Sequence, residues 1–384
     1  MTGPLAGVKV LDLTRMFAGP YCTQILADLG AQVLKVEDPR TGDPTRRNLP
    51  MKNSESAYFM ALNRGKRSLT MDLKSAADQE LLRSLISEAT VVVENFRPGV
   101  TRRLGIAPAS AAELNPRLVY CSLSGFGATG PYRDHISFDL INQAMAGFID
   151  LTGNPDGSPV RVGVPIGDMA GGLYTAMAAI SGLIHVQRTG SGIWFDLALH
   201  DVLVAMLDDV VLDYSAGGAA PVRRGRFGGR GQAIGCFQAR DGWVAVDVSR
   251  PGEPTRALTV LGQSVATEAD PADIGAALDG AVAEWTVADI VERLTKDGIA
   301  CSKVNAIDEV LAEAVTRAPG MRFGALHPAA GDIENLASPF ILDGRRAGTG
   351  TVSPLLGEAN DEVRARRTFP VFEEVASKAE KATT

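Results

Sequence analysis

Short apolar runs alternate with amphipathic stretches along the first third of the chain. Residues 7–13 (GVKVLDL) and 32–37 (QVLKVE) are rich in Val and Leu and predict buried strands, and the stretch between them predicts a helix that ends near Gly30. Two strands joined by a helix form a parallel pair with a right-handed crossover. The same alternation recurs in 67–73, 75–89 and 90–96, and then in 111–115 and 117–127. We therefore predict a doubly wound, Rossmann-like α/β domain.

Helical spacing of apolar residues dominates from about residue 138 to residue 215, in 139–151, 172–188 and 200–217. The glycine-rich stretch 225–235 (GRFGGRGQAIG) predicts a loop between two regions. After it, 236–249 predicts a hairpin that turns at Asp241–Gly242. We therefore predict a large domain over residues 1–225 and a smaller α/β domain over 226–330.

Composition and charge narrow the class of protein. With 384 residues, 45% of them apolar and 22% charged, the chain has the composition of a soluble globular protein. A net charge of −7 argues against nucleic acid as a partner. The four cysteines are far apart and the four histidines have no zinc-binding spacing, which predicts a reducing compartment and no metal. We see no signal peptide and no uncharged apolar run near the ~20 residues that cross a membrane, so we expect a cytoplasmic protein without a membrane partner.

One glycine motif points toward a dinucleotide and is rejected. GFGATG at 125–130 fits G-x-G-x-x-G, but that fingerprint requires the glycines to open a helix directly. Here PYRDHISFD follows, without an apolar period until Leu140. The loop after the first predicted strand has only Gly19 where the fingerprint needs three glycines. A nicotinamide cofactor is therefore not expected.

A single aspartate stands before three small residues in IGDMAGGLY (166–174). By residue type alone, Asp168 is best interpreted as a helix cap. The alternative is a bare carboxylate at the mouth of a pocket. These few residues leave the choice open.

Several segments together resemble the class III CoA-transferases, the formyl-CoA transferase-like family that also contains 2-methylacyl-CoA racemases. The segments, in family order, are LDLTRMFAGP, GDPTRRN, NRGKRSLTMDLK, VVVENFRPGV, LVYCSLSGFGATGPY, FDLINQAMAG, GDMAGGLY and SPLLGEANDE. The resemblance runs from about residue 5 to residue 365. It implies a large Rossmann-like domain completed by the C-terminal tail, 331–384, a small domain, and two subunits in an interlocked homodimer.

The resemblance also implies a catalytic role for Asp168, just before a turn at Ala170–Gly172. A carboxylate with an unperturbed pKa near ~4 is ionised at neutral pH and can attack a thioester. The family mechanism passes through an aspartyl anhydride and an aspartyl-CoA thioester, with coenzyme A as substrate and product and no permanently bound cofactor or metal. The glycine-rich stretch with Gly228, Gly229 and Gly231 resembles the family loop that closes over the acyl group.

Positions that contact CoA in the family correspond here to Met71, Lys74, Asn95, Phe96, Arg97 and Arg103. Lys and Arg can pair with phosphate, and Phe96 can pack on the adenine or the pantetheine arm. The alternative for Arg97, Arg102 and Arg103 is a solvated basic patch. Asp38 stands where some relatives carry a basic residue.

Three residues of the presumed acyl pocket separate the branches of the family. A racemase needs a histidine where this chain has Phe138, although the nearby His135 is a second candidate base, so we favour the transferase over the racemase. The formyl-CoA/oxalate branch has glutamine, lysine and tyrosine where this chain has Phe17, Ile136 and Phe138. We therefore predict a larger or more apolar acyl group.

We also predict a dicarboxylate such as succinate as one partner. Arg15 is a candidate cation for its free carboxylate or, equally, a structural residue. A non-catalytic acyl-CoA binding protein is a third possibility.

Overall fold

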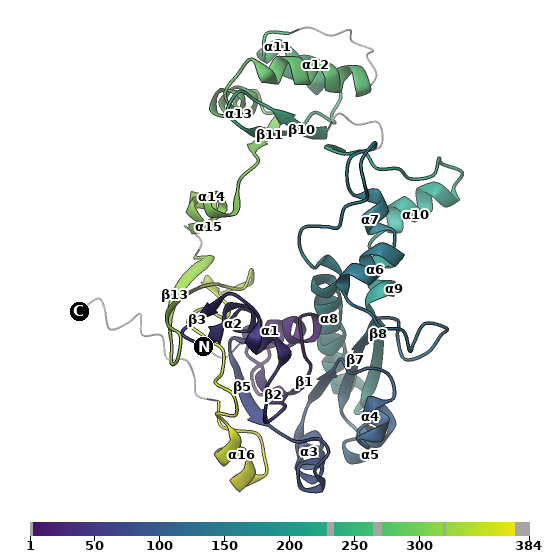
Figure 1. Ribbon diagram of the computed structural model, residues 1–384, viewed down its shortest axis with the longest axis vertical. Helices are drawn as coiled ribbons and strands as arrows, with labels where there is room; N and C mark the ends of the chain where they lie inside the picture. The colour runs from purple at the N-terminus through teal and green to yellow at the C-terminus, as the bar shows by residue number, and fades with distance from the viewer. Residues whose placement is uncertain (1–2, 229–233, 264–270, 318–319, 373–384) are drawn as a thin grey trace, which may run out of the picture. The chain divides into compact units, whose positions relative to one another are not determined.

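The computed structural model describes residues 3–228, 234–263, 271–317 and 320–372. The chain forms two units, each with its own core (Figure 1). The first unit takes in 1–146, 163–209 and 314–384, and the second takes in 147–162 and 210–313.

A six-stranded parallel sheet forms the centre of the first unit. Its strand order is β5-β2-β1-β6-β7-β8. The strands are β1 (Lys9–Leu13), β2 (Gln32–Glu37), β5 (Lys66–Thr70), β6 (Val91–Glu94), β7 (Val119–Ser124) and β8 (Ile193–Ala198). In chain order this is the 3-2-1-4-5-6 arrangement of doubly wound sheets, so the predicted fold class is confirmed. The order reverses between β1 and β6, where such sheets open a crevice at the carboxyl ends of their strands.

Helices cover both faces of this sheet because neighbouring side chains alternate between the faces. Leu11 and Leu34 pack on the side of α3 (Ala76–Glu88), α5 (Pro108–Leu114) and α16 (Asn360–Arg366). Val10 and Val33 pack on the opposite side, toward α1 (Ala18–Asp28) and α8 (Ile166–Thr189). Both faces are therefore dry, as the near-continuous apolar runs of these strands predict.

Helix α8 differs from its prediction. It is continuous from Ile166 to Thr189, so the expected turn at Ala170–Gly172 is wrong. A Cβ atom on Gly172 would lie 2.7 Å from the Ala18 carbonyl oxygen of α1, and one on Gly171 would lie 2.2 Å from a Leu199 methyl group. These glycines therefore serve close packing of the helix on its neighbours rather than a chain reversal.

The length of α8 also changes how its apolar composition is interpreted. Among the described residues, it is the one helix long and apolar enough to cross a membrane by length and composition. Half of its apolar window is buried within the protein, against α1, β7 and β8. A core helix of a folded domain meets the same two criteria.

Three other elements depart from the expectation. Strand β8 was not predicted, because its residues lie between two helical patterns and alternate in burial at a sheet edge. The predicted helix 139–151 breaks into α6 (Asp139–Met145) and α7 (Phe148–Leu151) at Gly147, which has φ 90°. The predicted helix 200–217 is likewise two helices, α9 (Leu199–Ala205) and α10 (Asp208–Ser215).

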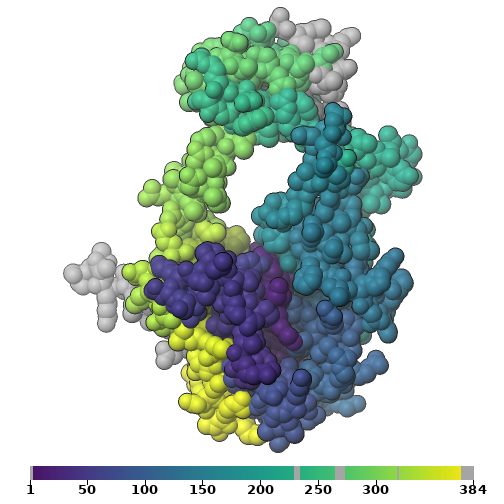
Figure 2. All heavy atoms as spheres, viewed as in Figure 1, coloured from purple at the N-terminus to yellow at the C-terminus, as the bar shows by residue number. Residues whose placement is uncertain are grey.

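The C-terminal segment packs along the edge strand β5. The Ala359 N–H donates to the Ser68 carbonyl, and the Asn360 side chain bonds both the N–H and the hydroxyl of Thr70. In Figure 2 this segment (yellow) lies against the N-terminal part of the chain (dark purple). The hairpin of β13 (Arg322–His327) and β14 (Gly331–Leu336) joins the same unit, since Ile333 packs on Met60.

The second unit is a small sheet covered by helices. Its strands follow the order β12 (Ala300–Lys303), β11 (Trp243–Asp247), β10 (Ile234–Gln238) and β9 (Phe227–Gly228), and the predicted hairpin turn at Asp241–Gly242 joins β10 to β11. Its helices are α11 (Glu253–Val260), α12 (Pro271–Ala283) and α13 (Val287–Lys296).

The bounds of this unit differ from the predicted 226–330. Residues 147–162 join it because Gly225 bonds Gly153 and Arg223 pairs with Asp150.

The remaining short elements of the chain are η1 (Pro44–Arg47), β3 (Met51–Lys52), β4 (Glu55–Ser56), α2 (Ala57–Asn63), α4 (Val100–Arg103), α14 (Ile307–Ala312), α15 (Ala314–Arg317), β15 (Ile341–Leu342) and β16 (Arg345–Arg346).

Candidate active site

Asp168 lies in the first turn of α8, but it does not cap the helix. The residue before the helix, Pro165, has no side chain that can do so. The Asp139 carboxylate from α6 takes that place: its Oδ1 accepts hydrogen bonds from the backbone N–H of Gly167 at 2.8 Å and of Asp168 at 3.2 Å. The Gln143 amide donates to the other oxygen of Asp139 at 2.6 Å. Asp139 therefore satisfies the free N–H groups that begin every helix, and it leaves the side chain of Asp168 free.

The electrostatics of Asp168 result from this arrangement. Burial and, after it, the neighbouring charge of Asp139 raise the pKa of Asp168 to about 7. The unperturbed pKa expected from the sequence is therefore wrong, because that expectation contained neither the burial nor the second carboxylate. Among the described residues, none donates a hydrogen bond to the Asp168 carboxylate. Such a half-buried, unpaired carboxylate is suited to attack on an electrophile.

Aromatic side chains stand next to this carboxylate. Burial and, after it, the charges of Asp168, Asp139 and Asp43 raise the pKa of Tyr58. The Phe17 ring lies 5.9 Å from the rings of Tyr58 and of Tyr21. The structure thus brings Phe17, from the loop before α1, toward the start of α8.

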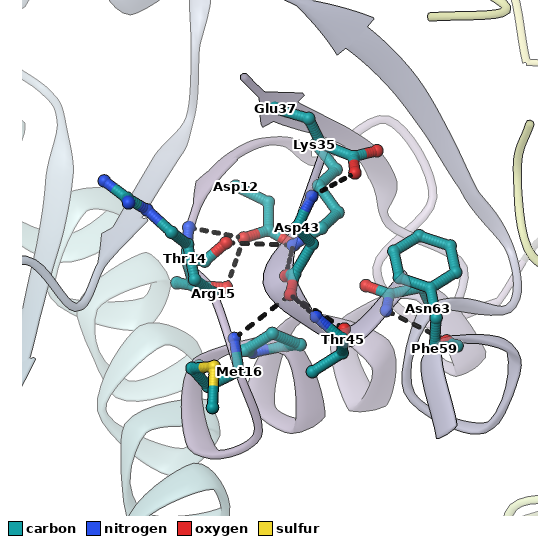
Figure 3. A network of polar contacts seen from close by, with 12 residues as sticks. Asp12, Thr14, Arg15, Met16, Lys35, Glu37, Asp43, Thr45, Phe59 and Asn63 are labelled. Atoms are coloured by element: carbon teal, nitrogen blue, oxygen red, sulfur yellow. Dashed lines mark hydrogen bonds and ion pairs between the residues drawn. The ribbon is translucent and has the colours of Figure 1, made fainter. Parts of the chain in front are cut away.

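The loop of Thr14–Phe17 rests on a buried network of charges at the carboxyl ends of β1 and β2 (Figure 3). Lys35 Nζ donates to the Thr14 carbonyl at 2.9 Å and pairs with Asp43 Oδ2 at 2.9 Å. The Met16 N–H donates to Asp43 Oδ1 at 3.4 Å, and Met16 has φ 70°. Few non-glycine residues adopt this left-handed conformation, so the network holds the loop in a strained shape.

Asp12 and Lys66 complete this network under α1. The Asp12 carboxylate accepts from the Thr14 N–H at 2.9 Å and the Thr23 hydroxyl at 2.7 Å, and it pairs with Lys66 Nζ at 3.1 Å. Although burial opposes ionisation, Lys66 and Lys35 lower the pKa of Asp12 to about 2. Burial lowers the pKa of Lys66 to about 8. Because every charge here has a partner, removing one would leave its partner buried and uncompensated.

Asn95 holds the backbone of Arg15 from the other side. Its Oδ1 accepts from the Arg15 N–H at 2.9 Å and its Nδ2 donates to the Arg15 carbonyl at 2.8 Å. The Arg15 guanidinium lies 5.0 Å from the centre of the Phe96 ring. Asn95 was predicted to contact CoA, but in the structure its amide positions Arg15.

A pocket of about 290 Å³ opens at the carboxyl ends of these strands. Its lining includes four of the predicted residues, Arg15, Met71, Lys74 and Phe96. Arg97 is exposed after β6 and Arg103 ends α4, and neither lines the pocket. Another pocket of about 290 Å³, in the second unit around Asp247 and Arg250, contains none of the predicted residues.

Phe138, His135 and Gly228 do not line this pocket. Phe138 directly precedes Asp139 and is 59% exposed. His135 packs against Tyr132, with ring centres 4.6 Å apart. Gly228 pairs with Ile234 in the second unit. Gly229 and Gly231 lie outside the described residues.

Sequence reasoning missed Asp139, Tyr58 and the Lys35–Asp43 pair. Asp139 stands next to Phe138 in a segment already noted, but only the tertiary fold shows that it caps α8. The sequence did contain a signal for the buried charges. Asp12, Lys35 and Lys66 stand within apolar runs that predict buried strands, and a charged residue in a buried strand needs a partner of opposite charge.

Comparisons with known proteins show the family of the chain. The model of CoA-transferase family III matches residues 5–360. The succinate–glutarate CoA-transferase of Agrobacterium fabrum is 34% identical over 94% of this chain and 95% of its own length. The acetyl-CoA:oxalate CoA-transferase of Acetobacter aceti is 42% identical over 62% of each protein. The crystal structure of a CAIB/BAIF family protein from Brucella suis superposes with a TM-score of 0.86 at 34% identity, covering 96% of this chain and all of that one.

Proposed function

The chain belongs to CoA-transferase family III and is an acyl-CoA:carboxylate CoA-transferase, and we propose that it transfers CoA from succinyl-CoA, or another medium-sized acyl-CoA, to a free carboxylic acid through covalent intermediates on Asp168. The observation that carries the proposal is the Asp168 carboxylate itself. It is unpaired among the described residues and sits at the start of a helix whose N–H groups Asp139 already satisfies.

The proposed chemistry conserves the energy of the thioester. The Asp168 carboxylate attacks the acyl carbon of the thioester and the C–S bond breaks. CoA departs as the thiolate, and an aspartyl acyl anhydride is formed. The thiolate attacks the aspartyl carbonyl and releases the donor acid, which leaves an aspartyl-CoA thioester. The acceptor carboxylate then attacks the aspartyl carbonyl and displaces the CoA thiolate, which forms a second anhydride between Asp168 and the acceptor. The thiolate attacks the acceptor's acyl carbon in this anhydride, which forms the new CoA ester and releases the Asp168 carboxylate. Each step exchanges one acyl bond for another, so the transfer itself balances without ATP.

The residues around Asp168 support an acyl group larger than that of oxalate. The aromatic rings of Phe17 and Tyr58 pack against each other, with centres 5.9 Å apart, on the elements that precede α8 in the first unit. Arg15 has an exposed guanidinium for which no carboxylate partner is found among the described residues. Diacids also appear in the names of the relatives that act on succinate and glutarate or on oxalate. We infer a dicarboxylate of four or five carbons as one of the two acids.

The racemase is the second candidate function. It requires a base beside the substrate α-carbon, and the side chain at position 138 is a phenylalanine, which cannot carry a proton. His135 is exposed and packs on Tyr132 instead. These two placements favour the transferase.

The deciding experiment separates both functions. The protein is incubated in D2O with a panel of acyl-CoA esters, with and without free acids, and mass spectrometry reads every CoA ester formed. New esters that match the added acids, absent with Asp168→Ala and present with the exposed control Asp134→Asn, support the transferase. Deuterium at the α-carbon without acyl exchange supports the racemase, and tight CoA binding without any turnover supports a binding protein.

Trapping tests the covalent intermediate. Incubation with succinyl-CoA alone followed by hydroxylamine converts an aspartyl thioester or anhydride into a hydroxamate. We expect the mass of the peptide that contains residue 168 to change accordingly, and that of no other peptide. Efficient transfer without this modification would contradict a covalent mechanism on Asp168.

We further propose that two chains form the interlocked homodimer of the family. Support comes from apolar side chains that the single chain leaves exposed along α8: Leu173 is 46% exposed, Met177 60% and Ile184 52%. Leu140 and Met145 of α6 are also exposed, at 49% and 44%. Extended apolar surface of this kind marks an interface with another protein surface.

A further inference from the structure

The pocket at the carboxyl ends of β1, β2 and β5 combines apolar side chains with four carboxylates in its lining. At about 290 Å³ it stands at the lower end of small-molecule sites, about 300–1,000 Å³, and therefore fits one end of a CoA molecule rather than the whole. Its apolar lining residues are Leu13, Val36, Met71, Leu73 and Phe96. Such a lining suits a flat aromatic ring system such as adenine.

Two of the four carboxylates in the lining are already neutralised. Glu37 accepts both arms of the Arg46 guanidinium, at 2.7 and 2.8 Å. Asp43 pairs with the buried Lys35 at 2.9 Å. Neither carboxylate adds much to the charge that a ligand meets.

Asp38 and Asp72 set the charge of the rim. Asp38 directly follows β2, and its Oδ1 accepts from the N–H groups of Arg40 at 2.9 Å and Thr41 at 3.1 Å. Its other oxygen lies 3.7 Å from the Arg40 guanidinium, whose side chain is 85% exposed, and solvent screens such a pair strongly. Asp72 is exposed and accepts from the Lys74 N–H at 3.0 Å. Both carboxylates keep lone pairs free for a ligand's hydroxyl groups.

The position of Asp38 at the end of β2 indicates which part of a nucleotide it contacts. In doubly wound sheets an acidic residue there accepts hydrogen bonds from ribose hydroxyls, whereas an arginine there accommodates a phosphate on the ribose. The 3′-phosphate of CoA carries about two negative charges, and a carboxylate beside it repels it. Lys74 and Arg15 are the cations of the lining. Arg15 stands in the loop that continues through Met16 and Phe17 to the start of α1.

We propose that this pocket binds the adenosine of CoA with its ribose against Asp38, that the 3′-phosphate adds little to binding, and that thioesters of dephospho-CoA therefore serve as substrates alongside thioesters of CoA. The proposal rests on the CoA-transferase function and names the form of the carrier that the site accepts.

Calorimetric titration of the purified protein with CoA and with dephospho-CoA tests it directly. We expect dissociation constants within about threefold of each other, because an exposed charge contact changes affinity only modestly. The succinyl thioesters of both carriers should show kcat/KM values within the same factor. CoA binding more than about thirtyfold tighter than dephospho-CoA would overturn the proposal.

A charge reversal locates the ribose. In Asp38→Arg the preference for CoA over dephospho-CoA should rise about tenfold, through tighter CoA binding, because repulsion becomes attraction. Glu113→Arg makes the same charge change on α5, outside the pocket lining, and should leave the preference unchanged. An unchanged preference in Asp38→Arg would show that the ribose lies elsewhere and overturn the proposal.

Lys74→Ala tests the remaining cation of the rim. We expect it to weaken both carriers equally, because both contain the diphosphate. A loss confined to CoA would place the 3′-phosphate on Lys74 and overturn the proposal. Equal binding of both carriers without any CoA transfer would refute the proposed function but leave the inferred binding of both carriers standing, so the two fail separately.

Discussion

The carboxylate of Asp139 accepts a hydrogen bond from the backbone N–H of Asp168 at 3.2 Å, so one acid holds the start of the helix that carries the other. This relationship has two effects. It fixes the first turn of α8, and it places a second negative charge where the Asp168 carboxylate must ionise. The Asp168 carboxylate therefore ionises against the negative charge of the residue that caps its helix.

The pH dependence of the reaction should report this pairing. With the pKa of Asp168 at about 7, kcat/KM should fall tenfold per pH unit below pH 7. Asp139→Asn keeps an acceptor for the helix N–H groups but removes the charge, so the acid limb should move to lower pH while remaining above that of a free aspartate, since burial is the larger cause. Rate profiles from pH 5 to 9 measure both, with Asp134→Asn as the control. An acid limb that does not move in Asp139→Asn would contradict the pairing.

The ionisation of Asp168 should lower the free energy of unfolding at neutral and higher pH. Its pKa is raised in the folded state, so the unfolded chain ionises first and stability is lost as the pH rises from about 4 through 7. Asp168→Asn, which cannot ionise, should be more stable than the wild type by about 4 kcal/mol at pH 8 and equal to it near pH 3.5. Chemical denaturation at the two pH values measures the difference. A variant less stable than the wild type at pH 8 would contradict the assignment.

Two glycine substitutions should change stability in opposite directions. A Cβ on Gly172 would lie 2.7 Å from the Ala18 carbonyl oxygen, a backbone atom that cannot move aside, so Gly172→Ala should destabilise the first unit by about 2 kcal/mol. Gly280 of α12 has no atom within 4 Å of such a Cβ, so Gly280→Ala should stabilise its helix by about 0.5–1 kcal/mol. Thermal unfolding of the two variants checks both signs. A neutral Gly172→Ala would show that α1 and α8 are less tightly packed than the structure has them.

Arg15 should act on the free carboxylate of a diacid. Asn95 and Lys35 fix its loop, and its guanidinium has no carboxylate partner among the described residues. Arg15→Ala should raise the KM for a dicarboxylate acceptor about tenfold or more, because a charge-assisted hydrogen bond contributes about 1.5–3 kcal/mol. The KM for a monocarboxylate of the same length and for the acyl-CoA should stay constant. Equal losses for both acids would assign Arg15 to CoA or to the structure of the loop instead.

The apolar face of α8 should be needed for assembly. Met177 is 60% exposed in the single chain, so Met177→Glu should place a charge in the proposed dimer interface and shift the molar mass in solution toward that of one chain. Leu326→Glu, at a side chain 73% exposed on β13, serves as the matched control. Light scattering coupled to size-exclusion chromatography measures both. A wild-type protein that is monomeric at micromolar concentration would overturn the dimer.

The sequence by itself determined the first five strands of the parallel sheet of the first unit, though not its edge strand β8, and pointed to Asp168. Within 7–13 and 32–37 the structure has strands over Lys9–Leu13 and Gln32–Glu37, whose Val and Leu side chains fill both faces of the sheet. Family motifs then identified Asp168 among the aspartates of the chain. Local pattern is sufficient for the strands, whereas Asp168 needed the resemblance to the family, because its residue type alone predicts a helix cap.

Only the tertiary structure decided the state of that carboxylate and the surroundings of the pocket. Asp139 lies 29 residues from Asp168 in the chain, Asn95 lies 80 residues from Arg15, and Lys66 lies 54 residues from Asp12. Burial, Coulomb interaction and hydrogen bonding all depend on distance in space, which no pattern along the chain contains. The same residues Ala170–Gly172 that suggest a turn locally form a continuous helix, because α1 and Leu199 pack closely where the glycines lack side chains.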